Sequence, residues 1–263
     1  MDFSMDNTDD QKAFRREVRG WLTAHVPRIE GNRDSEENYQ LLRELGRQLG
    51  ARGWLYPTAP VEYGGSGVSG DWAVIIAQEL ARYDLGLPPF PDSGGALAGQ
   101  CIAVWGNDEQ QRRILPRIIQ GEAVTWQLAT DPAGGSDFAT TSTTARWDGE
   151  QYIISGVKTW VQGSHLAEYL WTVVRTGPEE ARYQNLSWFM IPGHLPGIHV
   201  RPMEILQGEG QLGGQKSTVY LEDVRVSAAD LIGGLNNGWQ VAQTFLALKH
   251  GMSGRPEARD RAP

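Results

Sequence analysis

Residues Trp126–Asp137 read W-Q-L-A-T-D-P-A-G-G-S-D, a short apolar run that breaks into a turn. Pro132 has no backbone N–H and cannot continue a ladder of strand hydrogen bonds. Gly134 and Gly135 can adopt backbone angles that other residues avoid. A turn of this kind leaves backbone N–H groups free beside hydroxyl side chains. The stretch therefore predicts either a loop that holds a flat or anionic ligand or an ordinary connection between two strands.

The composition is that of a globular protein, and it argues against several classes of function. The 263 residues carry a net charge of −8, which does not favour a nucleic-acid partner. The single cysteine, Cys101, excludes an internal disulfide and a cysteine-based zinc site. The start of the chain, Met1–Asp6, is acidic without an apolar core, and no apolar run approaches the roughly 20 residues that span a bilayer. We expect a cytoplasmic protein with no membrane span.

Residues 8–121 have the periodicity of helices. A stripe of apolar residues predicts a first helix, and Ser35 followed by two glutamates predicts the start of a second. Further helices are predicted over residues 71–83 and 94–105. Asn107 and Gln110 have the spacing of a helix cap and its partner, which opens a helix that ends at Gly121. The stripe of the first helix consists of Phe14, Val18, Trp21 and Leu22.

After Gly121 the pattern changes to that of short strands. The turn Asp148-Gly149 between residues 143–147 and 152–154 is a hairpin signal. From Gly238 the helical pattern returns, and the Gly/Pro-rich and charged stretch Gly251–Pro263 is expected to be a disordered tail. Further strands are predicted over residues 158–161, 169–175, 186–191, 198–201 and 217–226.

These segments predict an α+β chain in three parts. We expect residues 1–122 to form an N-terminal α-helical domain, residues 123–234 a central β-barrel domain, and residues 235–263 a rudimentary C-terminal helical segment followed by the tail. The last helix has few partners within this arrangement. We therefore expect it to pack on the preceding domains or to be completed by another chain.

Other motifs do not indicate a site. Gly208–Gly213 matches G-x-G-x-x-G, but a strand-like run follows it where a dinucleotide-binding fold requires a helix. The five histidines lack the spacing of metal ligands, so no metal site is predicted. Glu79 and Glu122 have the pattern of surface or capping carboxylates, with no spacing that marks an acid–base pair.

Trp160 lies just after the hairpin, in the predicted strand 158–161. An indole at this position could fill the interior of the β-domain, as many tryptophans do. Alternatively, it could stack on a planar ring held by the loop of residues 130–137.

Taken together, these segments resemble the acyl-CoA dehydrogenase family. Residues 130–137 are similar to its T-E-P-x-A-G-S-D flavin loop, and residues 156–160 resemble its G-x-K-x-W strand. Residues 107–122 resemble the helix that leads into its central domain, and residues 222–239 resemble the passage into its C-terminal helices. The order and spacing match along essentially the whole chain.

The resemblance implies FAD bound between the central β-domain and C-terminal helices, often from two subunits. Trp160 would pack against the flavin ring, and Gln162 takes the place of the family's Thr or Ser near flavin N5. Ser136 would also approach the pantetheine arm of an acyl-CoA, which makes it the predicted substrate-binding residue. Asp131 replaces the family's Glu. The remaining cofactor-binding residues implied by the resemblance are Gln127, Ala129, Thr130 and Gly135.

The family's catalytic glutamate comes from its C-terminal helical domain and would lie beyond Pro263, so no catalytic residue is identified in this chain. The resemblance implies α,β-dehydrogenation of an acyl-CoA in fatty acid or lipid β-oxidation, with electrons passing to an electron-transfer flavoprotein. We expect a homo- or hetero-oligomer, and little activity unless another chain supplies the base. Two alternatives are a non-catalytic partner subunit of a heteromeric dehydrogenase and a flavin-dependent monooxygenase on the same scaffold.

Overall fold

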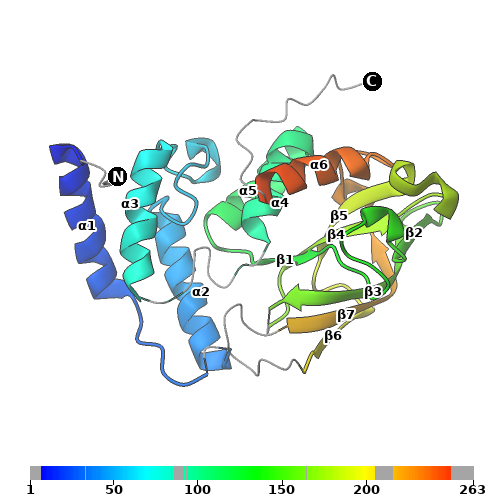
Figure 1. Cartoon of the computed structure of the whole chain (residues 1–263), viewed down its shortest axis with the longest axis horizontal. Helices are drawn as coiled ribbons and strands as arrows, with labels where there is room; N and C mark the ends of the chain where they lie inside the picture. The colour runs from blue at the N-terminus through cyan, green and yellow to red at the C-terminus, as the bar shows by residue number, and fades with distance from the viewer. Residues whose placement is uncertain are drawn as a thin grey trace. The chain divides into compact units, whose positions relative to one another are not determined.

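The computed structural model describes residues 7–32, 34–83, 85, 92, 94–163, 165–204 and 216–249. The glycine motif at 208–213 and the predicted tail at 251–263 lie outside the described residues. The chain divides into two compact units. The first contains the chain up to residue 91 together with Ile119–Glu122, and the second contains Asp92–Ile118 and everything from Ala123 onward (Figure 1).

The described residues of the first unit form the helices α1 (Asp9–His25), α2 (Glu36–Ala51) and α3 (Gly70–Leu80) and the short 3₁₀ turns η1 (Val61–Tyr63) and η2 (Ala81–Tyr83). Thr8 and Gln11 cap α1 reciprocally, at 3.2 and 3.0 Å. Two members of the predicted stripe are fully buried in the core of this unit, and the other two pack against it from partly buried positions. The buried side chains of α1 and α2 are Val18, Leu22, Leu42, Leu45 and Leu49.

The second unit contains the helices α4 (Gly95–Trp105), α5 (Asp108–Ile119) and α6 (Gly238–Lys249). The predicted cap of α5 is confirmed, because Asn107 and Gln110 each accept the other's backbone N–H at 2.9 Å. Figure 1 shows α6 beside α4, and the Trp105 Nε1 donates to Thr244 Oγ1 at 2.9 Å between them. Within the described residues, no helix is both long and apolar enough to cross a membrane.

Within the described part of the second unit, the strands form one eight-stranded sheet with the order β6-β7-β3-β2-β4-β5-β8, and β1 pairs in parallel with β4. The predicted hairpin is confirmed, with β2 and β3 antiparallel and Thr144 opposite Ser155. The short 3₁₀ turns are η3 (Phe138–Thr140), η4 (Glu179–Asn185) and η5 (Ala228–Asp230). The strands are β1 (Thr125–Leu128), β2 (Thr144–Trp147), β3 (Tyr152–Gln162), β4 (Tyr169–Arg175), β5 (Leu186–Pro192), β6 (Ile198–Pro202), β7 (Lys216–Val226) and β8 (Leu231–Ile232).

One strand differs from its prediction. Residues 158–161 do not form a second strand after the hairpin but are the continuation of β3, which runs without a break for 11 residues. Its pairing with β7 contains two irregularities, one between Ile154 and Gly156 and one between Lys158 and Val161. The second irregularity falls at Trp160 and determines the geometry of the candidate site.

An aromatic cluster joins α6 to the sheet. Trp171 of β4 stacks on Trp188 of β5 with 4.7 Å between the ring centroids, and the ring centroid of Phe245 of α6 lies 5.5 Å from that of Trp188. Trp188 Nε1 also donates to the carbonyl of Gly238 at the start of α6, at 3.0 Å. The apolar face predicted from Gly238 onward is therefore packed on the sheet rather than left alone.

Candidate functional site

The loop of residues 130–137 begins two residues after β1 with a tight turn. Asp131 and Gly134 exchange two backbone hydrogen bonds of 3.1 Å across Pro132 and Ala133. The glycines are required for a different reason than predicted, because neither has φ in the left-handed region. A Cβ on Gly135 would lie 2.7 Å from Thr130 Cγ2, so the absence of a side chain lets the loop fold back on its own start.

The first carboxylate of this loop, Asp131, is turned into the protein. It is paired with the Lys158 ammonium of β3, and both side chains are completely buried. Its other oxygen accepts the backbone N–H groups of Ser142 and Thr143 at 2.6 and 2.7 Å. Burial alone would raise the pKa of Asp131, but the Lys158 charge and these hydrogen bonds outweigh it and hold that pKa below its ordinary value. Asp131 is therefore an anchor of the loop and not a ligand group.

The second carboxylate, Asp137, anchors the other end of the loop. It accepts the Tyr183 hydroxyl at 2.7 Å and the Arg182 guanidinium at 3.0 Å, both from η4. It also caps η3 by accepting the Ala139 backbone N–H at 3.0 Å. The hydrogen bond from Tyr183 is the main reason that the pKa of Asp137 lies below its ordinary value. The segment that stays exposed to a ligand is therefore the one between these two anchors.

A bulge in β3 places Trp160 on the outer side of the strand. Lys158 lies opposite Val219, and Val161 opposite Ser217, so β3 has one residue more than β7 over this step. The extra residue lets both Lys158 and Val161 be buried, although they are an odd number of positions apart. Trp160 takes a left-handed φ of 57° and is 59% exposed. The interpretation of Trp160 as a core residue is therefore wrong.

The structure brings the predicted loop and strand together. The Thr159 backbone N–H donates to the Thr130 carbonyl at 2.8 Å, which joins β3 to the loop directly beside Trp160. Just past the end of β3, Gly163 has φ 151° and lies directly on the Trp126 indole of β1, where a Cβ would have no room. The end of β3 is thereby fixed against β1.

The other predicted residues lie along these two strands and the loop. Gln127 is partly buried in β1 opposite Trp171, and Ala129 is buried just after the strand ends. Gly135 and Ser136 are exposed, and so is Gln162, the last residue of β3. The functional roles of these residues stay predictions.

The arrangement fits a flat ligand that carries acceptor atoms. Trp160 offers an exposed indole face, and the backbone N–H groups of Gly135 and Ser136 have no hydrogen-bond partner among the described residues. Backbone donors beside an aromatic platform suit a planar ring with ring nitrogens and carbonyl oxygens, or a phosphate. Among the described residues, no three or more His, Cys, Asp and Glu side chains lie together in a way that could hold a metal ion.

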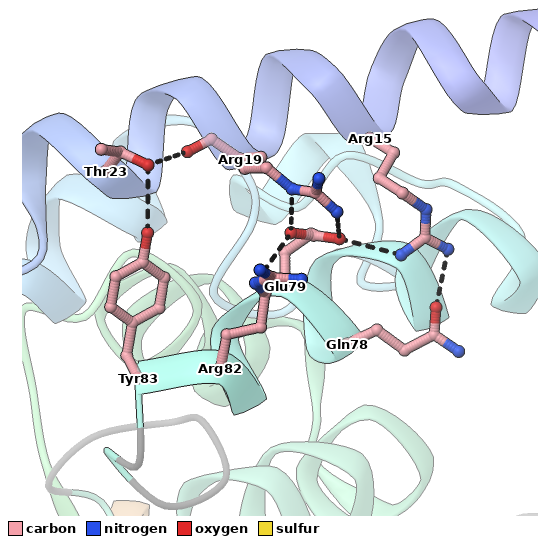
Figure 2. A network of polar contacts seen from close by, with 7 residues as sticks. All are labelled: Arg15, Arg19, Thr23, Gln78, Glu79, Arg82 and Tyr83. Atoms are coloured by element: carbon pink, nitrogen blue, oxygen red, sulfur yellow. Dashed lines mark hydrogen bonds and ion pairs between the residues drawn. The ribbon is translucent and has the colours of Figure 1, made fainter.

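Glu79 of α3, in the first unit, is not the surface carboxylate that its sequence pattern predicts. Its side chain is only 2% exposed and accepts three hydrogen bonds, one from Arg15 at 3.0 Å and two from Arg19 at 2.9 and 3.0 Å. Figure 2 shows these two side chains reaching it from α1, with Arg82 on a third side. The hydrogen bond from Arg19 is the main cause that holds the pKa of Glu79 below its ordinary value, against the effect of burial. This network ties α1 to α3.

Comparison with known families accounts for both halves of the chain. Residues 8–122 match the acyl-CoA dehydrogenase N-terminal domain, and residues 127–224 match the acyl-CoA dehydrogenase middle domain. The chain belongs to the acyl-CoA dehydrogenase family. The resemblance deduced from the loop and strand motifs is thereby confirmed, and so is the predicted combination of an N-terminal helical part, a β-sheet middle part and a short C-terminal helical part.

Individual members of the family are similar over most of the chain. The acyl-CoA dehydrogenase IpdE1 of Mycobacterium tuberculosis is 32% identical over 255 residues, which cover 93% of this chain and 64% of that protein. The ChsE4-ChsE5 complex of the same species has a chain with 30% identity and a TM-score of 0.74, covering 94% of this chain and 61% of its own. The Tcur3481-Tcur3483 steroid ACAD has 29% identity and a TM-score of 0.78, covering 95% and 63%. The chain thus spans less than two thirds of the length of these relatives.

Two residues of the site were not identified from the sequence. From the sequence, Lys158 is identified only as part of a family motif and its ion pair with Asp131 is not predicted, although the strand pattern indicates that the lysine is buried. In a strand whose residues 152 and 154 face inward, alternation places residue 158 inward as well, and a buried lysine requires a carboxylate partner. Tyr183 gave no comparable signal, because it meets Asp137 only through the tertiary fold.

Proposed function

We propose that this chain provides the N-terminal and middle parts of an FAD-dependent acyl-CoA dehydrogenase. The observation that carries the proposal is the exposed indole of Trp160, held on a strained bulge directly beside the loop of residues 130–137. A bulky residue keeps a left-handed φ only where the surrounding structure enforces it, and such strain is concentrated at functional sites. The reaction is the α,β-dehydrogenation of an acyl-CoA thioester.

The proposed roles of the chain's own residues follow from their positions. Trp160 supports one face or edge of the flavin ring, and the free backbone N–H groups of Gly135 and Ser136 donate to the cofactor or to the acyl-CoA arm. Gln127, Ala129 and Thr130 line the ring from the end of β1. When bound, FAD supplies the hydride acceptor for the β-carbon of the thioester.

Gln162 is one of the positions at which this chain departs from the pattern of the family it resembles, as Asp131 is. A glutamine amide can donate and accept hydrogen bonds, whereas the family's hydroxyl residue is shorter. In our proposal the Gln162 side chain reaches the flavin near N5 and influences the geometry of hydride transfer. Replacing Gln162 with Thr tests this role, because it is expected to change the rate of flavin reduction more than the affinity for FAD.

The base that removes the α-proton is proposed to lie outside residues 1–263. Abstraction of that proton needs a carboxylate next to the α-carbon and hydrogen bonds to the thioester oxygen. The sequence motifs assign no carboxylate of this chain to that position, and the loop carboxylates Asp131 and Asp137 are both engaged in anchoring. The chain is then weakly active or inactive alone and gains activity with the region that carries the base.

We propose an acyl-CoA of lipid breakdown as substrate, an electron-transfer flavoprotein as acceptor and the cytoplasm as the location. One similar structure is a steroid ACAD, so an acyl-CoA panel should include a steroid side-chain thioester beside straight-chain ones.

Three measurements on the purified chain test the proposal. The visible absorbance spectrum shows whether it carries FAD, and its mass in solution shows whether it assembles with a second copy or another protein. Anaerobic addition of acyl-CoA then shows whether the flavin is bleached. Tight FAD binding with weak or absent bleaching is expected, whereas a chain that binds no FAD alone or with a partner would overturn the proposal. Robust turnover by the isolated chain would overturn the assignment of the base to another region.

A second candidate function is that of a non-catalytic subunit that completes the site of a related chain. The observation in its favour is that two of the similar structures consist of two named proteins, ChsE4-ChsE5 and Tcur3481-Tcur3483. Co-purification with a full-length family member, and activity only in that complex, would support this function. Oxygen consumption by the reduced flavin without acyl-CoA would instead indicate the monooxygenase alternative.

A further inference from the structure

The ion pair of Asp131 and Lys158 joins the loop of residues 130–137 to β3, and neither side chain is exposed at the surface of the candidate site. Both side chains are completely buried, and among the described residues Lys158 has Asp131 as its hydrogen-bond partner. A buried ion pair loses the hydration of both charges, and well-packed apolar residues of similar volume are often equally stable in its place. Stability of the fold is therefore a weak explanation for this pair.

The pair connects the segments that carry the proposed ligand contacts. Asp131 directly follows Thr130, and Lys158 precedes Trp160 by two positions. The hydrogen bond of 2.8 Å from Thr159 to Thr130 runs beside the pair and fixes the same two segments at the backbone. The loop and β3 are thus joined by two neighbouring contacts, one between backbone atoms and one between charged side chains.

Asp131 also reaches a third segment. Its second oxygen accepts the backbone N–H groups of Ser142 and Thr143 and the Ser142 hydroxyl, at 2.6, 2.7 and 3.0 Å. These residues lie just before β2, on the chain that leaves the loop. One carboxylate therefore holds the loop where it begins, the chain where it leaves the loop, and the strand that carries Trp160.

We propose that Asp131 and Lys158 are positioning residues of the flavin site, which set the loop of residues 130–137 and the Trp160 bulge in the spacing that the ligand requires. This inference rests on the proposed function. A charge-assisted contact between two fixed points sets their separation more narrowly than apolar packing does, because it has a defined length and direction. The bulge needs such a support, since the left-handed φ of Trp160 is unfavourable and must be enforced by its neighbours.

The experiment replaces both charges at once. The double variant Asp131→Asn/Lys158→Met leaves no unpaired buried charge, keeps an amide oxygen for the Ser142 and Thr143 N–H groups, and fills the lysine volume with an apolar chain. The control is Asp148→Asn/Arg225→Gln, which removes the ion pair of 2.9 Å at the opposite end of β3. Thermal unfolding, the dissociation constant for FAD, and hydrogen exchange of the peptides that cover residues 126–143 and 156–163 are measured for each.

The double variant is expected to unfold within a few degrees of the unsubstituted chain but to bind FAD about 10- to 100-fold more weakly, as supporting residues of metal sites do when they are replaced. In the absence of FAD, both peptides of the double variant should exchange faster than the same peptides of the unsubstituted chain. The control variant should exchange at the rate of the unsubstituted chain and bind FAD with the same affinity. Unchanged FAD affinity and unchanged exchange would overturn the inference and leave the proposed function standing. If the unsubstituted chain binds no FAD alone or with a partner, the proposed function fails, and the exchange data alone decide whether the pair positions the loop. A double variant that fails to fold would show that the pair serves stability and would overturn the inference as well.

Discussion

Replacing Glu79 with Gln should destabilise the chain, because it removes a buried carboxylate that accepts hydrogen bonds from two arginines. Three hydrogen bonds from Arg15 and Arg19 end on a carboxylate that is 2% exposed (Figure 2). Breaking a fully buried pair costs about 3–5 kcal/mol. Arg19 and Arg82 are 48% and 59% exposed and can turn to water, which reduces the loss. We expect Glu79→Gln to lower the free energy of unfolding by about 2–3 kcal/mol.

Acidification provides a second signature of the same network. The folded-state pKa of Glu79 lies below its ordinary value, which is about 4.3 in an unfolded chain. Its contribution to stability is therefore complete above that pH and is lost as the pH falls through the folded-state pKa. The gap in stability between the unsubstituted chain and Glu79→Gln should be widest near pH 7 and should shrink toward pH 3.

Thermal unfolding followed by circular dichroism measures both effects. A loss of 2–3 kcal/mol corresponds to a midpoint lower by roughly 5–10 °C for a chain of this size. The matched control is Glu62→Gln, which removes an exposed carboxylate from η1 of the same unit. A Glu79→Gln chain as stable as the control at pH 7, or a gap that stays constant down to pH 3, would refute the reasoning from the buried network.

Three further predictions concern the second unit. Gly163→Ala should lower the free energy of unfolding by about 1–3 kcal/mol, because the added Cβ overpacks against the Trp126 indole. Gly149→Ala is the control, since Gly149 also has positive φ but has open space around it. Differential scanning calorimetry of both variants should show the larger loss for Gly163→Ala. Cys101 should not react with Ellman's reagent at pH 8 until the chain is unfolded, because burial raises the pKa of its thiol to about 12. Trp160→Ala should weaken FAD binding in a flavin-fluorescence titration without lowering the unfolding midpoint, since the indole is 59% exposed; a loss of stability equal to that of a core tryptophan would contradict this.

Much of the fold could be predicted because its signals are local. The cap of α5 depends on two residues three positions apart, and the β2–β3 hairpin on a two-residue turn signal. The loop of residues 130–137 is recognisable in the same way, from its proline and glycines. Such signals act within a few residues and do not depend on the rest of the chain.

The bulge at Trp160 could not be predicted, because it depends on how β3 pairs with β7, some 60 residues away. Strict alternation from Lys158 would place Trp160 on the inner face, as the core interpretation assumed. The extra residue between Lys158 and Val161 reverses the direction of every later side chain. Burial of Glu79 was missed for a related reason, since its arginine partners on α1 lie about 60 residues earlier. In both positions a tertiary contact overrode a local pattern.

The partners of the two loop carboxylates matter for the proposed binding of an anionic ligand by this acidic chain. If Asp131 and Asp137 faced the ligand, their negative charges would repel the phosphates of a nucleotide or of coenzyme A. Instead Lys158 neutralises the first in the interior, and Arg182 and Tyr183 hold the second. With both carboxylates engaged by these partners, the exposed part of the loop presents the Ser136 hydroxyl and the backbone N–H groups of Gly135 and Ser136, which have no hydrogen-bond partner among the described residues. A Lys158→Met change alone would therefore do more than loosen the loop, since it would leave an uncompensated negative charge directly behind it.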